Sequence, residues 1–194
     1  VLQGAVENMR NFLLGILCTI IILCGAVYLV AFRGYINFQA DQQPSASEAE
    51  FAMSVVDAST DRRAPKVENP VPATEENVTA GAKLFADHCA GCHGVPSNPD
   101  SQFSRSFYPP VPEFFKDAPD MSDNQNFYII QHGVRWTGMP AWGGTLSDGQ
   151  IWQVVTFLSN IEKLPPAALA VFGPQAPVAP PPTKNMPMHM HMDH

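Results

Sequence analysis

Two thiols and an imidazole, those of Cys89, Cys92 and His93, form the pattern CxxCH in the middle of this chain. This pattern is typical of covalent attachment of a c-type haem. Each thiol can add to one vinyl group of the macrocycle, and the adjacent histidine can then bind the iron. A redox dithiol would not require the histidine, and a zinc half-site would need a second ligand pair. Cys18 and Cys24 cannot supply that pair because they lie within an apolar run. The sequence therefore predicts one covalently bound haem c with His93 as an iron ligand.

A second iron ligand is expected in the segment Thr-Gly-Met-Pro-Ala-Trp at residues 137–142. Met139 lies there between a glycine and a proline, so a non-helical backbone can present its thioether in a fixed position. The alternative is that this methionine only fills the core, as methionines commonly do. The competing ligands have weaker contexts, because each lies beside a predicted helix end or next to the motif itself: Met121, His132 and His88. The pattern favours His93 and Met139 as the two axial ligands.

A run of 21 residues without a charge, residues 12–32, lies near the start of the chain between Arg10 and Arg33. Such a run is long enough to cross a bilayer as one helix. It is too long for the apolar region of a cleaved signal peptide and keeps large residues to its end. Because haem is attached to such proteins outside the bacterial cytoplasm, residues 1–11 are predicted to be a short cytoplasmic N-terminus. The rest of the chain is predicted to face the periplasm from the inner membrane.

Three further regions are predicted after this single-pass anchor. Residues 33–73 are polar and proline-containing, which indicates a flexible periplasmic linker. Residues 74–164 contain the haem motif and several helix signals. Helices are expected from Thr74 into the motif, after the capping-box sequence at 122–125, and after a second one at 147–150 until Pro165 and Pro166. Residues 165–194 read as an extended proline-rich tail.

The region 74–164 resembles the class I cytochrome c family. The resemblance rests on an ordered set of features: Gly81, Phe85, the CxxCH motif, the Gly-Met-Pro-Ala-Trp segment at 138–142, and a final amphipathic helix with Trp152 and Phe157. It implies an all-α fold, the class I cytochrome c fold around one covalent haem, preceded here by the single transmembrane helix. It also implies that the first and last helices of the domain cross near Gly81 and Phe85, against Trp152 or Phe157.

The resemblance further implies an environment for the haem. A proline in the loop after the motif offers its carbonyl to the proximal histidine in this family, and Pro109 or Pro110 matches by position. Family members hold the haem propionates with Trp, Arg or Tyr donors. The corresponding residues here are Arg105, Arg135, Trp136 and Trp142, each of which has an alternative role as surface charge or core aromatic.

Two axial ligands leave the iron no open position, so the sequence favours electron transfer over enzymatic catalysis. The protein is expected to act as a tethered shuttle or as a subunit of a larger respiratory or photosynthetic complex. The expected partners are a quinol-oxidising complex, a terminal oxidase or a photosynthetic reaction centre. The alternatives are a haem peroxidase or gas-binding sensor with a labile Met139, and a structural assembly subunit. The formal net charge of −7 argues against a nucleic-acid partner.

The last residues alternate methionine and histidine. Thioethers prefer Cu(I) and imidazoles accept either copper state, so copper could bind there; a disordered Met-rich tail is the alternative. The copper ligands would be Met186, Met188, His189, Met190, His191, Met192 and His194.

Overall fold

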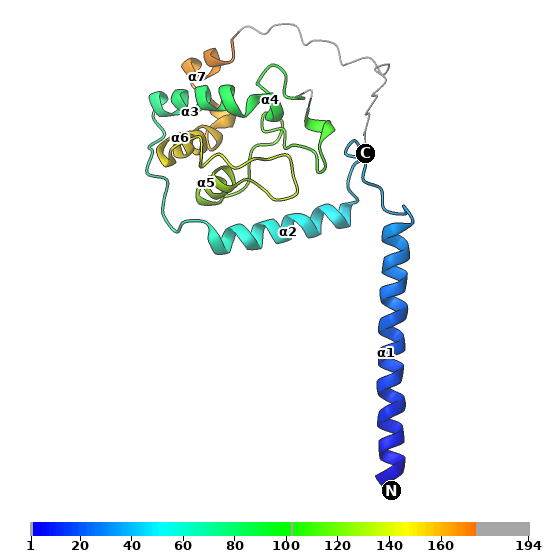
Figure 1. The fold of residues 1–194 in the computed structure, drawn as a ribbon. Coiled ribbons are helices and arrows are strands. Elements are labelled where there is room, and N and C mark those ends of the chain that lie inside the picture. Colours follow the sequence, from blue (N-terminus) through cyan, green and yellow to red (C-terminus); the bar gives the residue numbers. More distant parts are fainter. Residues whose placement is uncertain (1, 102, 174–194) are drawn as a thin grey trace, which may run out of the picture. The chain divides into compact units, whose positions relative to one another are not determined.

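The computed structural model describes residues 2–101 and 103–173. The chain divides into two units, residues 1–39 and residues 40–194. The first unit contains α1 (Leu2–Phe32), and the segment Val6–Phe32 within it has a mean hydropathy of 2.7 over its most apolar window. Its length and composition are those of a helix that can cross a membrane. The helix also continues through the residues that precede the predicted span (Figure 1).

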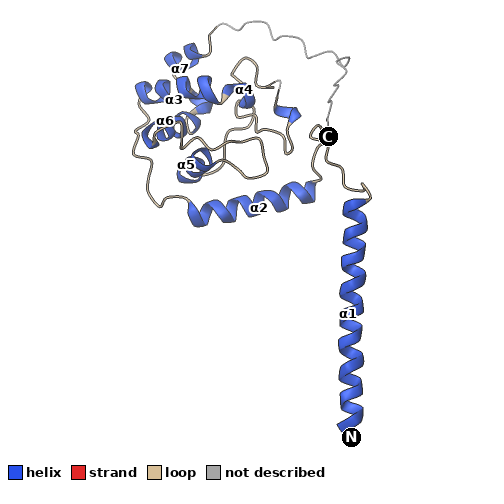
Figure 2. Cartoon of the chain, in the orientation of Figure 1, coloured by secondary structure: helices blue, strands red, loops and turns tan. Residues whose placement is uncertain are grey.

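The second unit is helical, and its described residues contain no strand (Figure 2). Its elements are α2 (Ala46–Arg63), α3 (Glu75–His88), α4 (Ala90–His93), the 3₁₀ turn η1 (Ser104–Ser106), α5 (Asp123–His132), α6 (Asp148–Leu158), η2 (Ile161–Lys163) and α7 (Pro166–Val171). The core lies where α3, α5, α6 and α7 pack together. This arrangement confirms the predicted all-α class.

The crossing of α3 and α6 depends on Gly81. A Cβ atom at this position would lie 2.1 Å from the carbonyl oxygen of Gln153 and 2.8 Å from the Cβ of Phe157. Only glycine allows the two backbones to approach this closely. The rings of Phe85 and Phe157 lie 5.0 Å apart. The predicted crossing is therefore confirmed, with Phe157 as the aromatic partner, whereas Trp152 stacks on Phe127 of α5 at 4.2 Å.

Both predicted capping boxes are present. The backbone N–H of Ser122 donates to Gln125 Oε1 at 3.0 Å, and that of Ser147 donates to Gln150 Oε1 at 2.9 Å. These contacts satisfy polar groups that a helix start leaves free. They set where α5 and α6 begin, and the box at Ser147 therefore sets where the loop that contains Met139 ends.

The segment 33–73 is not a flexible spacer throughout, which corrects the sequence-based expectation. α2 packs against α5, and Thr60 and Ala64 at its end are buried. The Gln125 side-chain amide donates to Asp61 Oδ1 at 3.0 Å, and that of Asn69 donates to Thr156 Oγ1 at 3.0 Å. The Ser45 side chain caps the first turn of α2. Apolar periodicity is weak in α2, so polar contacts rather than an apolar stripe hold this helix to the domain.

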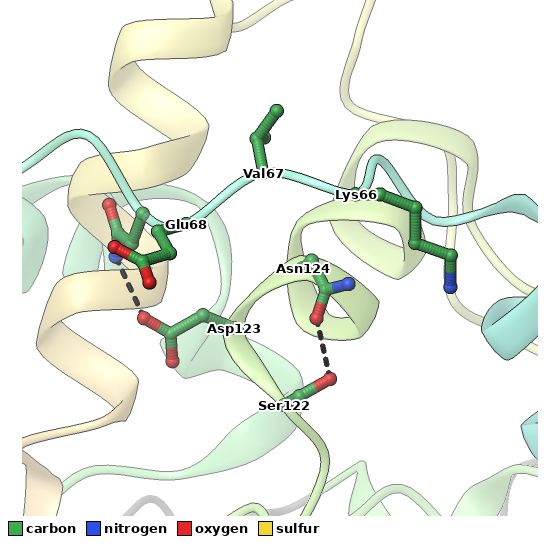
Figure 3. A pocket seen from close by; sticks show the side chains of 7 residues that line it. Lys66, Val67, Glu68, Ser122, Asp123 and Asn124 are labelled. Carbon is green, nitrogen blue, oxygen red and sulfur yellow. Dashed lines mark hydrogen bonds between the residues drawn. The ribbon is translucent and has the colours of Figure 1, made fainter.

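The chain between α2 and α3 follows the start of α5. Asn69 also donates to Asp123 Oδ2 at 3.0 Å, and Figure 3 shows Lys66, Val67 and Glu68 on a strip of chain that passes this helix end. An open surface pocket of about 450 Å³ lies between them. Its lining residues include none of the predicted haem ligands.

The domain extends beyond Leu164, where the sequence predicted an extended tail. Pro165 and Pro166 were expected to end the structure, but Pro166 opens α7, since proline suits the first position of a helix. Ala168 is fully buried, and Phe172 lies 5.6 Å from the Phe115 ring. The extended tail is therefore wrong for residues 166–172. The Met and His residues at 186–194 lie outside the described residues.

Candidate haem site

The junction of α3 and α4 positions the three residues of the CxxCH motif. Cys89 ends α3, and its carbonyl oxygen accepts hydrogen bonds from Cys92 N at 3.1 Å and His93 N at 2.9 Å. Both cysteines are free thiols and half-buried, whereas His93 is buried. Gly94 follows with a φ of +81°, and a Cβ there would lie 2.5 Å from the carbonyl oxygen of Pro99. This glycine allows the sharp turn by which the chain leaves the motif.

The His93 ring is oriented by a backbone carbonyl of the following loop. Its Nδ1 lies 2.9 Å from the carbonyl oxygen of Pro112. A carbonyl can only accept, so Nδ1 must donate and the lone pair of Nε2 is left to bind a metal. The predicted acceptors, Pro109 and Pro110, are wrong. Residues 109–112 are three prolines and one valine, and the path of the loop, not the spacing, decides which carbonyl reaches the ring.

Burial also tunes the ionisable groups of the motif. It lowers the pKa of His93, while the hydrogen bond to Pro112 raises it by less. The lowered pKa favours the neutral imidazole, which is the form that binds metals. Burial, together with the neighbouring Cys92, raises the pKa of Cys89 to about 12. The free Cys89 thiol is therefore protonated at neutral pH. Once its sulfur is bonded to haem as a thioether, it has no proton to lose.

Aromatic rings surround the histidine. Phe114 stacks on the His93 ring with centroids 4.5 Å apart and planes 5° apart, and Phe85 lies 6.4 Å away. The tripeptide 112–114 therefore contacts the His93 ring twice, through the Pro112 carbonyl and the Phe114 ring. Neither residue was predicted to contact His93, although both lie in the proline-containing loop that follows the CxxCH motif.

The loop that contains Met139 is closely packed. Gly133 has a φ of +67°, and a Cβ there would lie 2.7 Å from the Met139 carbonyl oxygen. The Met139 N–H donates to Thr137 Oγ1 at 3.1 Å, and its carbonyl accepts from Val134 N at 3.2 Å. A Cβ at Gly138 would lie 2.6 Å from the Phe107 ring. Met139 itself is half-buried against the core, on a backbone held from several sides.

The remaining predicted haem-environment residues differ in exposure. Arg105 is exposed and lies 3.8 Å from Asp100. Arg135 and Trp136 are also exposed; the Arg135 guanidinium lies over the Trp136 ring at 5.9 Å, and 90% of Trp136 is accessible.

Trp142 is half-buried, and its ring lies 5.1 Å from the ring of His88, the residue directly before the motif. Pro109 is exposed after a cis peptide bond, and Pro110 is half-buried.

Comparison with known proteins places this site in a family. Residues 76–158 match the family described as cytochrome c oxidase, cbb3-type, subunit III. The chain is 29% identical over 92 residues to cytochrome c6 of Picosynechococcus sp., which covers 46% of this chain and 77% of that protein. A chain of the Kuenenia stuttgartiensis reducing HAO-like protein complex is 23% identical with a TM-score of 0.41. The match covers 50% of this chain and 50% of the chain from that complex.

The helical fold and the CxxCH site define a haem-attachment domain of the c type. Residues 76–158 form a cytochrome c domain with a single CxxCH motif. This family holds haem c covalently and transfers electrons. The donor set fits the group: two thiols lie within one turn, and a neutral imidazole directs its free nitrogen away from Pro112.

Proposed function

We propose that this protein transfers electrons through one haem c that Cys89 and Cys92 hold covalently and that His93 and Met139 ligate. The observation that carries the proposal is the His93 hydrogen bond to the Pro112 carbonyl, 2.9 Å long, which presets the tautomer that can bind iron. When bound, the haem supplies one-electron redox chemistry. The chain contributes the attachment points, the orientation of the imidazole and an aromatic surround.

Met139 is supported as the second ligand by the way its loop is held. Its backbone is packed against Gly133 and hydrogen-bonded to Val134 and Thr137. A held backbone presents a thioether at low entropic cost. A thioether ligand raises the reduction potential, and a filled coordination shell favours electron transfer over catalysis.

Carbon monoxide binding to the reduced protein tests this ligation. We expect no binding to the native protein, ready binding to Met139→Ala, and none to Met121→Ala, which removes a competing methionine. Ready binding to the undenatured native protein would support the peroxidase or gas-sensor alternative and contradict the proposal. The same titration on His132→Ala and on His88→Ala distinguishes the two remaining competing ligands from Met139.

The proposed location is the bacterial inner membrane, with the N-terminus cytoplasmic and the haem domain periplasmic. The apolar helix α1 supports a single-pass anchor, and covalent haem attachment supports the orientation. A tether raises the effective concentration of the domain near membrane partners, so tight binding is not needed. Protease protection in spheroplasts tests the topology, because residues 40–194 should be digested from the outside.

The proposed partner is a membrane redox complex that exchanges electrons with this haem. A terminal oxidase is supported by the description of the matched family, while the likeness to cytochrome c6 leaves a photosynthetic reaction centre or a quinol-oxidising complex as alternatives. Purification from solubilised membranes tests which complex accompanies the protein. An assembly role predicts that the complex fails to form without the protein, whereas a shuttle role predicts that it forms and lacks only electron flow.

Copper binding by the Met and His residues at 186–194 is a second proposal, and it rests on the sequence alone. We expect Cu(I) to bind the intact protein and to be lost when residues 186–194 are removed. Replacing only the three histidines there should weaken Cu(II) more than Cu(I), since thioethers retain the reduced ion. No copper affinity in the intact protein would end this proposal.

A further inference from the structure

We propose that Glu113 is a positioning residue for the iron ligand His93, and that Ser104 and Lys116 hold it in place. The inference rests on the proposed function, because it concerns the histidine that would bind the haem iron. Glu113 lies between the two residues that contact the ring: Pro112 accepts from His93 Nδ1 at 2.9 Å, and Phe114 stacks on the ring at 4.5 Å.

The Glu113 side chain is anchored by two donors. Ser104 Oγ donates to its Oε1 at 2.9 Å, and Lys116 Nζ donates to its Oε2 at 2.8 Å. Ser104 is only 1% exposed, so the hydroxyl sits in a fixed position in the interior. Asp100 pairs with the same lysine and balances its charge.

The Glu113 backbone is held as well. Its carbonyl oxygen accepts from Lys116 N at 2.8 Å and from Asp117 N at 3.1 Å. On the other side of Pro112, Val111 N donates to the Ser104 carbonyl oxygen at 2.9 Å. Ser104 therefore ties the loop on both sides of Pro112, by its backbone at Val111 and by its side chain at Glu113.

These two hydrogen bonds of Ser104, to Val111 and to Glu113, determine where the Pro112 carbonyl and the Phe114 ring lie. Partners outside the first coordination shell orient metal-binding histidines and set how strongly they donate to the metal. A looser Pro112 contact would weaken the hydrogen bond from Nδ1, make the imidazole a poorer donor and raise the reduction potential. The alternative is that the network only stabilises the loop and leaves the histidine unaffected.

Ser104→Ala in the haem-loaded full-length protein tests the proposal, since it removes the hydroxyl without changing the charge. Ser106→Ala is the matched control, because Ser106 is an exposed serine of the same 3₁₀ turn. Two quantities are measured: hydrogen exchange of the His93 Nδ1 proton by NMR with ¹⁵N-labelled histidine, and the reduction potential by redox titration. Ser104→Thr keeps a hydroxyl and is the conservative rescue.

We expect Ser104→Ala to speed Nδ1 proton exchange about tenfold, within the range of effects that outer-shell changes have on metal sites. Its potential should rise above that of Ser106→Ala, and Ser104→Thr should return both quantities toward native values. Glu113→Gln should give a smaller change in exchange than Glu113→Ala, because the amide oxygen can still accept from Ser104.

Equal exchange rates and potentials in Ser104→Ala and Ser106→Ala would overturn the positioning role. A lower unfolding midpoint for Ser104→Ala with unchanged exchange and potential would also overturn it, because it would show a purely structural network. Absence of covalent haem from the native protein would instead defeat the proposed function, so the two failures are distinguishable.

Discussion

Gly133 controls the backbone of the loop that presents Met139. An alanine there would have to adopt a φ of +67° and place its Cβ 2.7 Å from the Met139 carbonyl oxygen. We expect Gly133→Ala to lower the free energy of unfolding by about 2 kcal/mol or more, since a left-handed backbone and an overpacked contact each cost about 1–2 kcal/mol.

Gly144→Ala is the control for this prediction, because no atom lies within 4 Å of the Cβ it would add. Denaturant unfolding of the haem-loaded protein measures the free energy in both variants. We also expect Gly133→Ala, unlike Gly144→Ala, to let the reduced protein bind carbon monoxide. Equal stability of the two variants would contradict the packing argument.

The lowered pKa of Asp100 predicts that the stability of the fold depends on pH. Its hydrogen bond to Lys116 holds the pKa of this carboxyl below its ordinary value of 3.8. The folded state therefore binds fewer protons than the unfolded chain around this pH, so the pair stabilises the fold above pH 3.8 and the effect is lost as the pH falls through the lowered pKa.

Urea midpoints across the acid range measure this effect. Asp100→Asn should be less stable than the native protein near neutral pH, and the difference should shrink at acid pH. The effect is small and screened by salt because the pair is exposed. Asp117→Asn removes a nearby exposed carboxylate as a control, and an identical pH profile for both variants would refute the assignment.

At the scale of elements, the crossing of α3 and α6 depends on one missing side chain. Gly81→Ala would place a Cβ 2.1 Å from a backbone oxygen of α6. We expect a loss of about 3 kcal/mol in the free energy of unfolding, at the upper end of overpacking effects, because a backbone atom cannot rotate away. Gly149→Ala on α6 has open space and should instead gain about 0.5 kcal/mol. Chemical denaturation measures the free energy of unfolding of Gly81→Ala and Gly149→Ala.

The residue that follows α7, Phe172, contributes an aromatic side chain to the core. Phe172 lies 6.0 Å from Phe157 and 6.3 Å from Phe85, the rings that join α3 and α6. Phe172→Ala should cost about 2 kcal/mol, less than a fully buried phenylalanine, because the residue is half-buried. Leu169→Ala, at a position 47% exposed on the same helix, should change stability little. Thermal unfolding measures both variants. Equal midpoints for Phe172→Ala and Leu169→Ala would mean that α7 does not belong to the folded domain.

At the scale of the whole molecule, residues 40–194 contain the complete core and the haem motif. We expect this part, exported to an oxidising compartment with haem attachment, to be water-soluble and to show the spectrum and unfolding midpoint of the full-length protein. Release of the haem part into the soluble fraction and retention of the full chain in membranes would support the anchor. A domain without covalent haem would contradict the division into two units.

Local patterns in the sequence predicted several features correctly. Each capping box at 122–125 and 147–150 involves residues within one helical turn, and α1 follows from an uninterrupted apolar run. The crossing at Gly81 was also predictable, although it is a long-range contact, because a glycine followed by Phe85 on the same face is part of the family pattern. The CxxCH residues lie within one turn for the same local reason.

Only the tertiary structure decided which residues complete the site. Pro112 rather than Pro109 or Pro110 reaches His93, because the ties from Ser104 to Val111 and Glu113 set the path of the loop. α2 was missed because its apolar periodicity is weak, and α7 was missed because Pro165 and Pro166 were interpreted as the end of the last helix. Local signals determine where helices begin, whereas contacts between distant residues determine which carbonyl and which ring face the histidine.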